Sequence, residues 1–256
     1  MTIRTLLTAA GAIALVMTAA PVAADTGRTP PGAPCLKSNG NPCNNNNGNL
    51  GAQGNAGHER VRIDRKPLPI DLAMPAVSGR GAYISQIGDA NVATIRQTAP
   101  NAYARVDQTG AANEADVTQS GSGTVYARAA QIGHGNFARV EQSGSGQNLI
   151  TLDQNGNRNW AWTNQHSIGA ILNGARLIQS GNDNDMKLVQ DGSDNRALLT
   201  QEGDGNGMTV AQLGDGNRLA WTQQGSNLSD LQITQTGGTE KSGQLSITQT
   251  GTGSGI

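Results

Sequence analysis

The sequence predicts an all-β protein in which short strands and turns stack into a β-solenoid, preceded by a disordered N-terminal arm. Three observations predict this class. From about residue 80 to Gln249, a glutamine recurs every 11 to 14 residues. Apolar residues stand two and four positions before nearly every one of these glutamines, which is the alternation of a strand. A glycine stands two positions after most of them and begins a run of Gly, Asn and Asp, the residues that tight turns use.

The first 24 residues have the organisation of a secretory signal peptide. Arg4 provides the positive start, "LLTAAGAIALVMTAA" is the apolar stretch, and "VAA" before Asp25 is a small-residue cleavage site. A transmembrane anchor is the alternative, but it needs a longer apolar run of about 20 residues. The sequence therefore predicts a secreted, extracellular protein.

Residues 25–79 are rich in Pro, Gly and Asn and show no sustained period, which is typical of a disordered arm. Within it, "RVRIDRK" at residues 60–66 is interpreted as solvated charge. Cys35 and Cys43 enclose "LKSNGNP", and an oxidising compartment would let them form a small disulfide loop. Two free thiols are the alternative. His58 stands alone near them, so the sequence predicts no metal site and no cofactor.

Residues 80–256 are predicted to be one repeat region, with the unit N-x-A-x-φ-x-Q-x-G-x-x, where φ is a large apolar residue. The turns are too short for crossover helices, so each strand–turn–strand arch has to stack on the next. Fifteen glutamines then give about fifteen short strands in seven to eight rungs.

The amides of the unit explain how such a stack holds its register. A buried unpaired amide costs about 1–3 kcal/mol, but a glutamine stacked on a glutamine can donate to its neighbour's carbonyl. Amide ladders of this kind occur in cross-β assemblies. The ladder is predicted to contain Gln86, Asn91, Gln97, Gln108, Asn113, Gln119, Gln131, Asn136, Gln142, Gln154, Asn159, Gln165, Gln179, Asn184, Gln190, Asn195, Gln201, Asn206, Gln212, Asn217, Gln223, Gln235 and Gln249.

The ends of the repeat region carry the functional expectation. Repeat proteins that stay monomeric need capping elements, and no helix or long loop follows the last unit, "GQLSITQTGTGSGI". Two open edges that present the same ladder are templates for another copy. The sequence therefore predicts that the chain is its own partner and polymerises end to end.

The units "QIGDANVATIRQ", "QIGHGNFARVEQ" and "QDGSDNRALLTQ" resemble the curlin repeat of curli fibre subunits, with the pattern Q-x-G-x-x-N-x-A-x3-Q. The unit "QLGDGNRLAWTQ" departs from it by Leu219 at the alanine position. The resemblance covers about residues 80–256. It implies a bacterial functional amyloid that passes an outer-membrane export pore and assembles into fibres for surface adhesion and biofilm matrix. It also implies a second curlin subunit as partner.

Two alternatives remain open. The chain could be the minor curlin subunit that nucleates fibres at the outer membrane. It could also be a monomeric β-solenoid adhesin that binds surface glycans through its outer aromatic residues, such as Tyr103 and Trp160. Catalysis is not expected, because the three histidines do not recur with a partner. A net charge of −1 also argues against a nucleic-acid partner.

Overall fold

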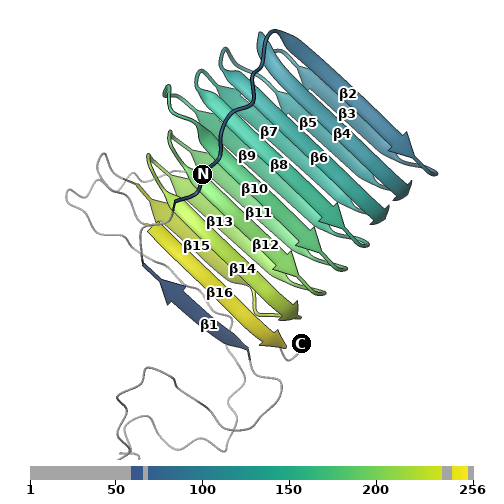
Figure 1. The fold of residues 1–256 in the computed structure, drawn as a ribbon, viewed down its shortest axis with the longest axis vertical. Coiled ribbons are helices and arrows are strands. Elements are labelled where there is room, and N and C mark those ends of the chain that lie inside the picture. The colour runs from purple at the N-terminus through teal and green to yellow at the C-terminus, as the bar shows by residue number, and fades with distance from the viewer. Residues whose placement is uncertain (1–58, 66–68, 238–243, 253–256) are drawn as a thin grey trace, which may run out of the picture.

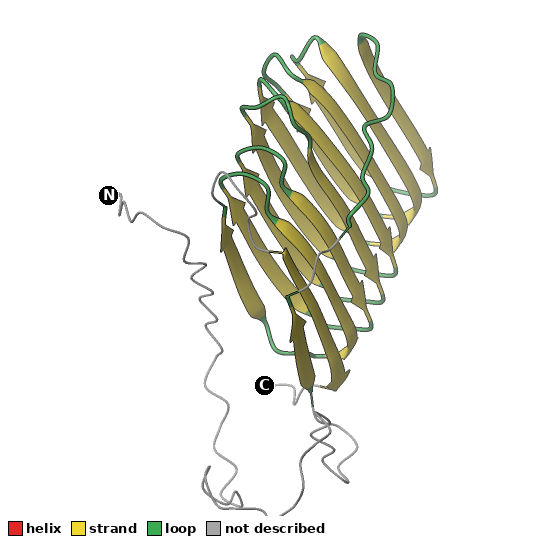
Figure 2. Ribbon diagram, turned by 60° about the vertical axis from the view of Figure 1, so that its left-hand side comes forward, coloured by secondary structure: helices red, strands yellow, loops and turns green. Residues whose placement is uncertain are grey.

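The computed structural model describes residues 59–65, 69–237 and 244–252, and every regular element in them is a β-strand. Two sheets, parallel except for one antiparallel edge strand, face each other and form a solenoid (Figure 1, Figure 2). The predicted all-β solenoid is thereby confirmed. The predicted signal peptide and the Cys35–Cys43 pair lie outside the described residues. No helix in the described ranges is long and apolar enough to span a membrane.

The chain alternates between the two sheets, so that successive strands lie opposite each other and strands two apart are neighbours. The nine-stranded sheet contains, in chain order, β1 (Arg60–Asp64), β2 (Arg80–Ile87), β4 (Asn101–Ala111), β6 (Thr124–His134), β8 (Gln147–Asn155), β10 (Asn173–Ser180), β12 (Arg196–Glu202), β14 (Arg218–Ser226) and β16 (Gln244–Thr252). The seven-stranded sheet contains β3 (Val92–Gln97), β5 (Glu114–Gln119), β7 (Phe137–Gly144), β9 (Trp160–Ser167), β11 (Asp185–Asp191), β13 (Gly207–Leu213) and β15 (Leu231–Thr236).

All pairings between the fifteen repeat strands are parallel, and equivalent positions of the unit lie next to each other. Gln86 pairs with Gln108 across β2 and β4, and Gln97 pairs with Gln119 across β3 and β5. A slip by one residue would turn every inward side chain outward, so the buried face fixes this register.

The core is a thin apolar layer between the two sheets. It is built from columns of small and large aliphatic residues, such as Ala104 beside Ala127 and Val106 beside Ala129, all fully buried. Trp221 occupies the large apolar position of β14 and is also fully buried. Alanine in one column keeps the facing sheets close, while the larger residues of the other fill the space between them.

The turns explain why glycine recurs two positions after the glutamine. Gly110 has a φ of 118°, and a Cβ there would lie 2.0 Å from the carbonyl oxygen of Gly133 in the next rung. Only glycine tolerates both this backbone conformation and this approach. Ala90 and Ala112, by contrast, adopt a left-handed φ of 54° in the same turns without being glycine.

Part of the predicted arm packs on the solenoid. β1 pairs in antiparallel orientation with β16, from Arg60 opposite Thr250 to Asp64 opposite Ser246. The interpretation of residues 60–66 as simple solvated charge missed this strand. The expectation that both ends are uncovered is wrong for the edge of β16, because β1 forms hydrogen bonds along it (Figure 1).

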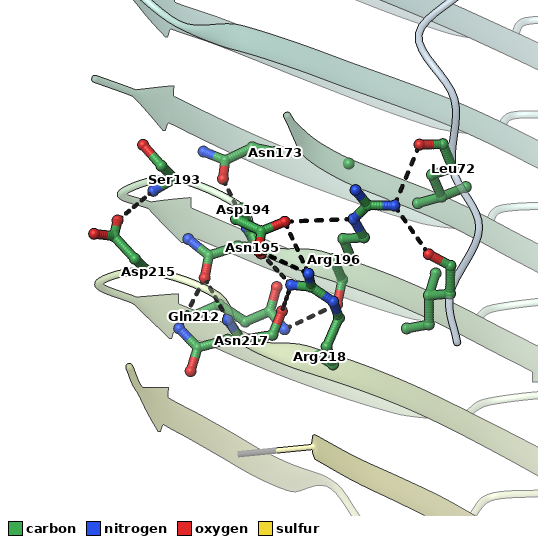
Figure 3. A network of polar contacts seen from close by, with 12 residues as sticks. Leu72, Asn173, Ser193, Asp194, Asn195, Arg196, Gln212, Asp215, Asn217 and Arg218 are labelled. Carbon is green, nitrogen blue, oxygen red and sulfur yellow. Dashed lines mark hydrogen bonds and ion pairs between the residues drawn. The ribbon is translucent and has the colours of Figure 1, made fainter. Parts of the chain in front are cut away.

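Residues 69–79, before β2, cross the outer face of the nine-stranded sheet. Arg196 of β12 donates to the carbonyl oxygens of Ile70 at 3.1 Å and Leu72 at 3.5 Å (Figure 3). Leu72 lies over Gly174, where an added Cβ would be 3.1 Å from the leucine Cδ1. These contacts fasten residues 70–72 to the outer face of β10 and β12.

Candidate functional site

The ladder glutamines form two continuous columns of side-chain hydrogen bonds, one in each sheet. In the nine-stranded sheet each Nε2 donates to the Oε1 of the next glutamine at 2.7–3.0 Å, through Gln86, Gln108, Gln131, Gln154, Gln179, Gln201, Gln223 and Gln249. In the seven-stranded sheet the same bonds measure 2.6–2.9 Å, through Gln97, Gln119, Gln142, Gln165, Gln190, Gln212 and Gln235. Every donor points from the β2/β3 end toward the β15/β16 end.

In every ladder glutamine after Gln86, Nε2 also donates to a backbone carbonyl oxygen of the opposite sheet or of the loop before β15. Gln131 of β6 donates to the carbonyl oxygen of Glu114 in β5 at 2.9 Å, and Gln190 of β11 donates to that of Gly174 in β10 at 3.3 Å. Both amide hydrogens are therefore used, one along the column and one across the core. These bonds offset the free-energy cost of burying the amides, because the cost of about 1–3 kcal/mol applies only to a buried polar group without a hydrogen-bond partner.

The asparagines stack in the turns and hold them in the same way. The backbone N and Nδ2 of Asn136 both donate to Oδ1 of Asn113, at 3.1 and 3.0 Å, and Nδ2 also donates to the Gly156 carbonyl at 2.8 Å. One edge of the solenoid carries the column Asn91, Asn113, Asn136, Asn159, Asn184 and Asn206, and the other carries Asn173, Asn195 and Asn217.

The second asparagine column stops before it reaches the β2/β3 end. Below Asn148 the equivalent positions are Val125 and Ala102, which form a small apolar cluster with Ala99. The buried Oδ1 of Asn148 has no hydrogen-bond partner among the described residues, because Nδ2 of Asn173 in the next rung donates to the carbonyl oxygens of His166 and Gly192. In the turn at residues 98–102, apolar contacts and backbone hydrogen bonds therefore replace the asparagine ladder.

The outer faces carry ion pairs between neighbouring rungs. Arg96 lies 2.8 Å from Asp116, Arg128 lies 2.7 Å from Asp153, and Arg158 lies 2.6 Å from Asp183. The hydrogen bond from Arg158 lowers the pKa of Asp183 below its usual value. Exposed pairs of this kind contribute little stability, but they keep the outer faces polar.

Aromatic side chains also stack between rungs on the outside. Tyr103 lies parallel to Tyr126 with ring centroids 5.0 Å apart, and Phe137 lies parallel to Trp160 at 6.0 Å. Lys187 places its Nζ 4.8 Å from the ring centroid of Trp162. In the described ranges, no group of three or more His, Cys, Asp or Glu side chains is arranged to hold a metal ion.

The two ends of the solenoid differ in exposure. At the β2/β3 end, Ile84 is 49% exposed, although its counterpart Val106 one rung further is fully buried. At the other end, Ile247 of β16 is only 2% exposed, because Ile63 of β1 pairs with it and packs against the same core.

Glu59, the residue before β1, closes the ladder of the nine-stranded sheet. One carboxylate oxygen accepts from Nε2 of Gln249, and the other accepts from the backbone N of Ser229 at 3.1 Å and from its Oγ at 2.6 Å. One weak signal for this contact is present in the sequence: the alternation of "RVRID" after Glu59. These five residues contain no ladder glutamine, so their sequence fits a strand and a charged loop equally well.

The comparisons with known proteins agree with the repeat. The model of the curlin associated repeat matches residues 81–121, 110–144, 147–192 and 192–225. No curated protein and no solved structure matches the chain.

Proposed function

Because the chain belongs to the curlin associated repeat family, we propose that it is a secreted structural subunit whose copies join end to end into curli-like amyloid fibres at the bacterial cell surface. The fibres serve surface adhesion and form part of the biofilm matrix. Such a subunit acts as a building element and catalyses no reaction. Its first partner is another copy of itself.

One observation carries this proposal: the glutamine ladders run without interruption through all fifteen repeat strands, from Gln86 and Gln97 to Gln235 and Gln249. Each rung therefore presents to the next the same donors, acceptors and apolar columns that it receives from the one before. A further rung from another copy meets the same chemistry as a rung of the same chain. The exposed edge of β2 supports this, because an unpaired strand edge is a template for a strand.

Two further partners follow from the family and belong to the same proposal. A second curlin subunit would nucleate the fibre, and an outer-membrane pore would export the chain. The ion pairs on the outer faces support assembly along one axis, since polar outer faces disfavour apolar association side by side.

A monomeric adhesin is the second candidate, favoured by β1, which covers the edge of β16. The row of Tyr83, Tyr103 and Tyr126, in which Tyr103 stacks on Tyr126 and Tyr83 is tilted by 36° against Tyr103, would supply an aromatic surface for sugar rings. This function needs a soluble monomer that stays monomeric and binds a glycan.

Incubation of the purified mature chain, residues 25–256, separates the two. As a fibre subunit it forms thioflavin-binding filaments after a lag, and aligned filaments diffract at about 4.7–4.8 Å along the fibre axis. A concentrated sample that stays monomeric and gives no such reflection contradicts the fibre function and favours the adhesin.

A further inference from the structure

The edge of β16 is occupied by a strand that does not continue the repeat. All repeat strands pair in parallel, whereas β1 is antiparallel and only five residues long. β14 and β16 pair over nine positions, from Arg218 opposite Gln244 to Ser226 opposite Thr252. β1 therefore pairs with five positions of β16 in antiparallel orientation, on an edge that could hold a longer, parallel strand.

Glu59 takes the position of one more ladder residue. In each rung, Nε2 of a glutamine donates to the next Oε1, and Gln249 makes this bond with a Glu59 carboxylate oxygen. A carboxylate can only accept, so this ladder cannot continue beyond Glu59. β1 and Glu59 together, here called the cap strand, end both the backbone ladder and the side-chain ladder of the nine-stranded sheet.

The number of repeat strands decides what would follow without the cap strand. A complete rung contains one strand from each sheet. Because fifteen is odd, β16 in the nine-stranded sheet has no partner strand in the seven-stranded sheet, which ends at β15 in the described chain. A second copy stacked by simple translation would place its β2 on β16 and leave the seven-stranded sheet one strand short. A copy rotated by half a turn about the solenoid axis places its β2 on β15 and its β3 on β16, and the alternation continues unbroken.

The rotation is compatible with the side chains because both sheets carry the same unit. β2 and β3 each present an Ala, a large apolar residue and a Gln at alternating positions: Ala82, Ile84 and Gln86, and Ala93, Ile95 and Gln97. In the half-turn arrangement Gln97 of the second copy comes beside Gln249. Its Oε1 then occupies the position that Glu59 holds in the monomer.

We infer that the edge of β16 is the docking site for β3 of a second copy rotated by half a turn, and that the cap strand occupies this site in the monomer and has to leave before the copy can dock. This rests on the proposed fibre function and states which strands meet. A tethered strand has an effective concentration on the order of millimolar, so it competes well with copies present at micromolar concentration. The cap strand thereby slows assembly without preventing it.

A reversible lock tests the cap strand. Arg62 and Thr248 are directly opposed in the antiparallel pair, at a separation that a disulfide spans. R62C/T248C, in a C35S/C43S background, fixes β1 on β16 when oxidised and frees it when reduced. T200C/T222C joins the opposed positions of β12 and β14 and is the matched control, because it leaves the edge of β16 untouched.

Seeded elongation is expected to be slower by on the order of tenfold or more for oxidised than for reduced R62C/T248C, and equal in both states for T200C/T222C. Equal elongation rates of oxidised and reduced R62C/T248C would contradict the proposal that the cap strand has to leave β16, and would leave the fibre function unaffected. Absence of filaments from the control in both states contradicts the fibre function itself, and the inference falls with it.

Disulfide mapping in filaments tests the half-turn. Thr248, Arg96 and Ser85 each stand one position before a ladder glutamine, in β16, β3 and β2. Filaments grown from a mixture of T248C and R96C copies, in the same C35S/C43S background, are expected to form an intermolecular disulfide between these positions. Cross-linking of T248C to S85C in its place shows simple translation and overturns the half-turn. Filaments that form neither cross-link overturn docking at β16.

Discussion

Glu59 accepts a hydrogen bond from Gln249 across a sequence separation of 190 residues. The contact joins a residue of the arm to the last glutamine of a ladder that begins at Gln86. The same carboxylate also binds Ser229, so it closes the turn before β15 together with the edge of β16. A single acidic side chain thus occupies the end of the ladder, next to the edge that β1 covers.

Replacement of Glu59 is expected to shorten the lag before filaments form. Glu59→Ala leaves Nε2 of Gln249 without its carboxylate acceptor and weakens the hold of β1, so the edge of β16 opens more often. Glu114→Ala is the control, because Glu114 is an exposed glutamate of β5 whose side chain takes no part in the ladder. Thioflavin kinetics at matched concentrations measure the lag, and a lag identical to that of the control contradicts the expectation.

Glutamines inside a ladder should matter more to stability than glutamines at its end. Gln190→Ala removes bonds to Gln165, Gln212 and the Gly174 carbonyl, and a loss of at least about 3 kcal/mol is expected at about 1–3 kcal/mol for each buried group left unpaired. Gln97→Ala, in the first rung, has a smaller effect.

Gln224→Ala is the matched control for this comparison, because Gln224 follows a ladder glutamine but points outward and binds only Glu202. Urea unfolding of freshly purified monomer gives the free energies. Equal losses for Gln190→Ala and Gln224→Ala would show that the column does not stabilise the fold.

The turns offer a substitution that stabilises and one that destabilises, two residues apart. Ala112 has a left-handed φ of 54°, so Ala112→Gly should relieve strain and raise the free energy of unfolding by roughly 0.5–1 kcal/mol. Gly110→Ala should be severely destabilising, because its Cβ would lie 2.0 Å from the Gly133 carbonyl oxygen. Thermal unfolding of the two variants checks the opposite signs, and a loss of stability in Ala112→Gly would contradict the strain argument.

Replacing Asp183 or Asp185, which are two residues apart, by asparagine should change the free energy of unfolding at neutral pH in opposite directions. Partial desolvation and the nearby Asp230 raise the pKa of Asp185, so its charged form opposes folding at neutral pH and protonation relieves that cost. Asp185→Asn should therefore stabilise the monomer at pH 7, with a gain that shrinks as the pH falls through the raised pKa. The hydrogen bond from Arg158 lowers the pKa of Asp183, so Asp183→Asn should destabilise at pH 7 and lose its effect in acid.

Urea unfolding of the parent and Asp185→Asn at pH 7 and pH 4, and of the parent and Asp183→Asn at pH 7 and below pH 3, measures these differences. A gain for Asp185→Asn that is equal at both pH values would show that its charge is not the cause.

The repeat could be predicted from the sequence because every rung repeats the same local rule. The glutamine spacing fixed the strands, the alternation fixed their inward faces, and Gly and Asn marked the turns. The structure places Gln86 beside Gln108 and Asn113 beside Asn136 as this rule requires. Parallel stacking lets one unit predict all the others.

The cap strand could not be predicted in the same way. The residues from Arg60 to Asp64 alternate, but they contain no ladder glutamine, and their partner lies at the opposite end of the chain. The pairing is decided by the edge that β16 leaves open and by the segment at Ile70 and Leu72 that Arg196 holds against the sheet. Such a contact forms only on the complete solenoid, and it leaves no repeating pattern in the sequence from which it could be predicted.

The common orientation of the glutamine amides gives an assembly of these molecules a direction. Each Gln carbonyl faces back toward β2 and each Gln N–H points on toward β16, so head-to-head contact would set oxygen against oxygen between two copies. The glutamine amides of both copies are satisfied only when the β2/β3 end of one copy adds to the β15/β16 end of the other. The two tips of a filament should therefore be chemically unlike and should lengthen at unequal speeds.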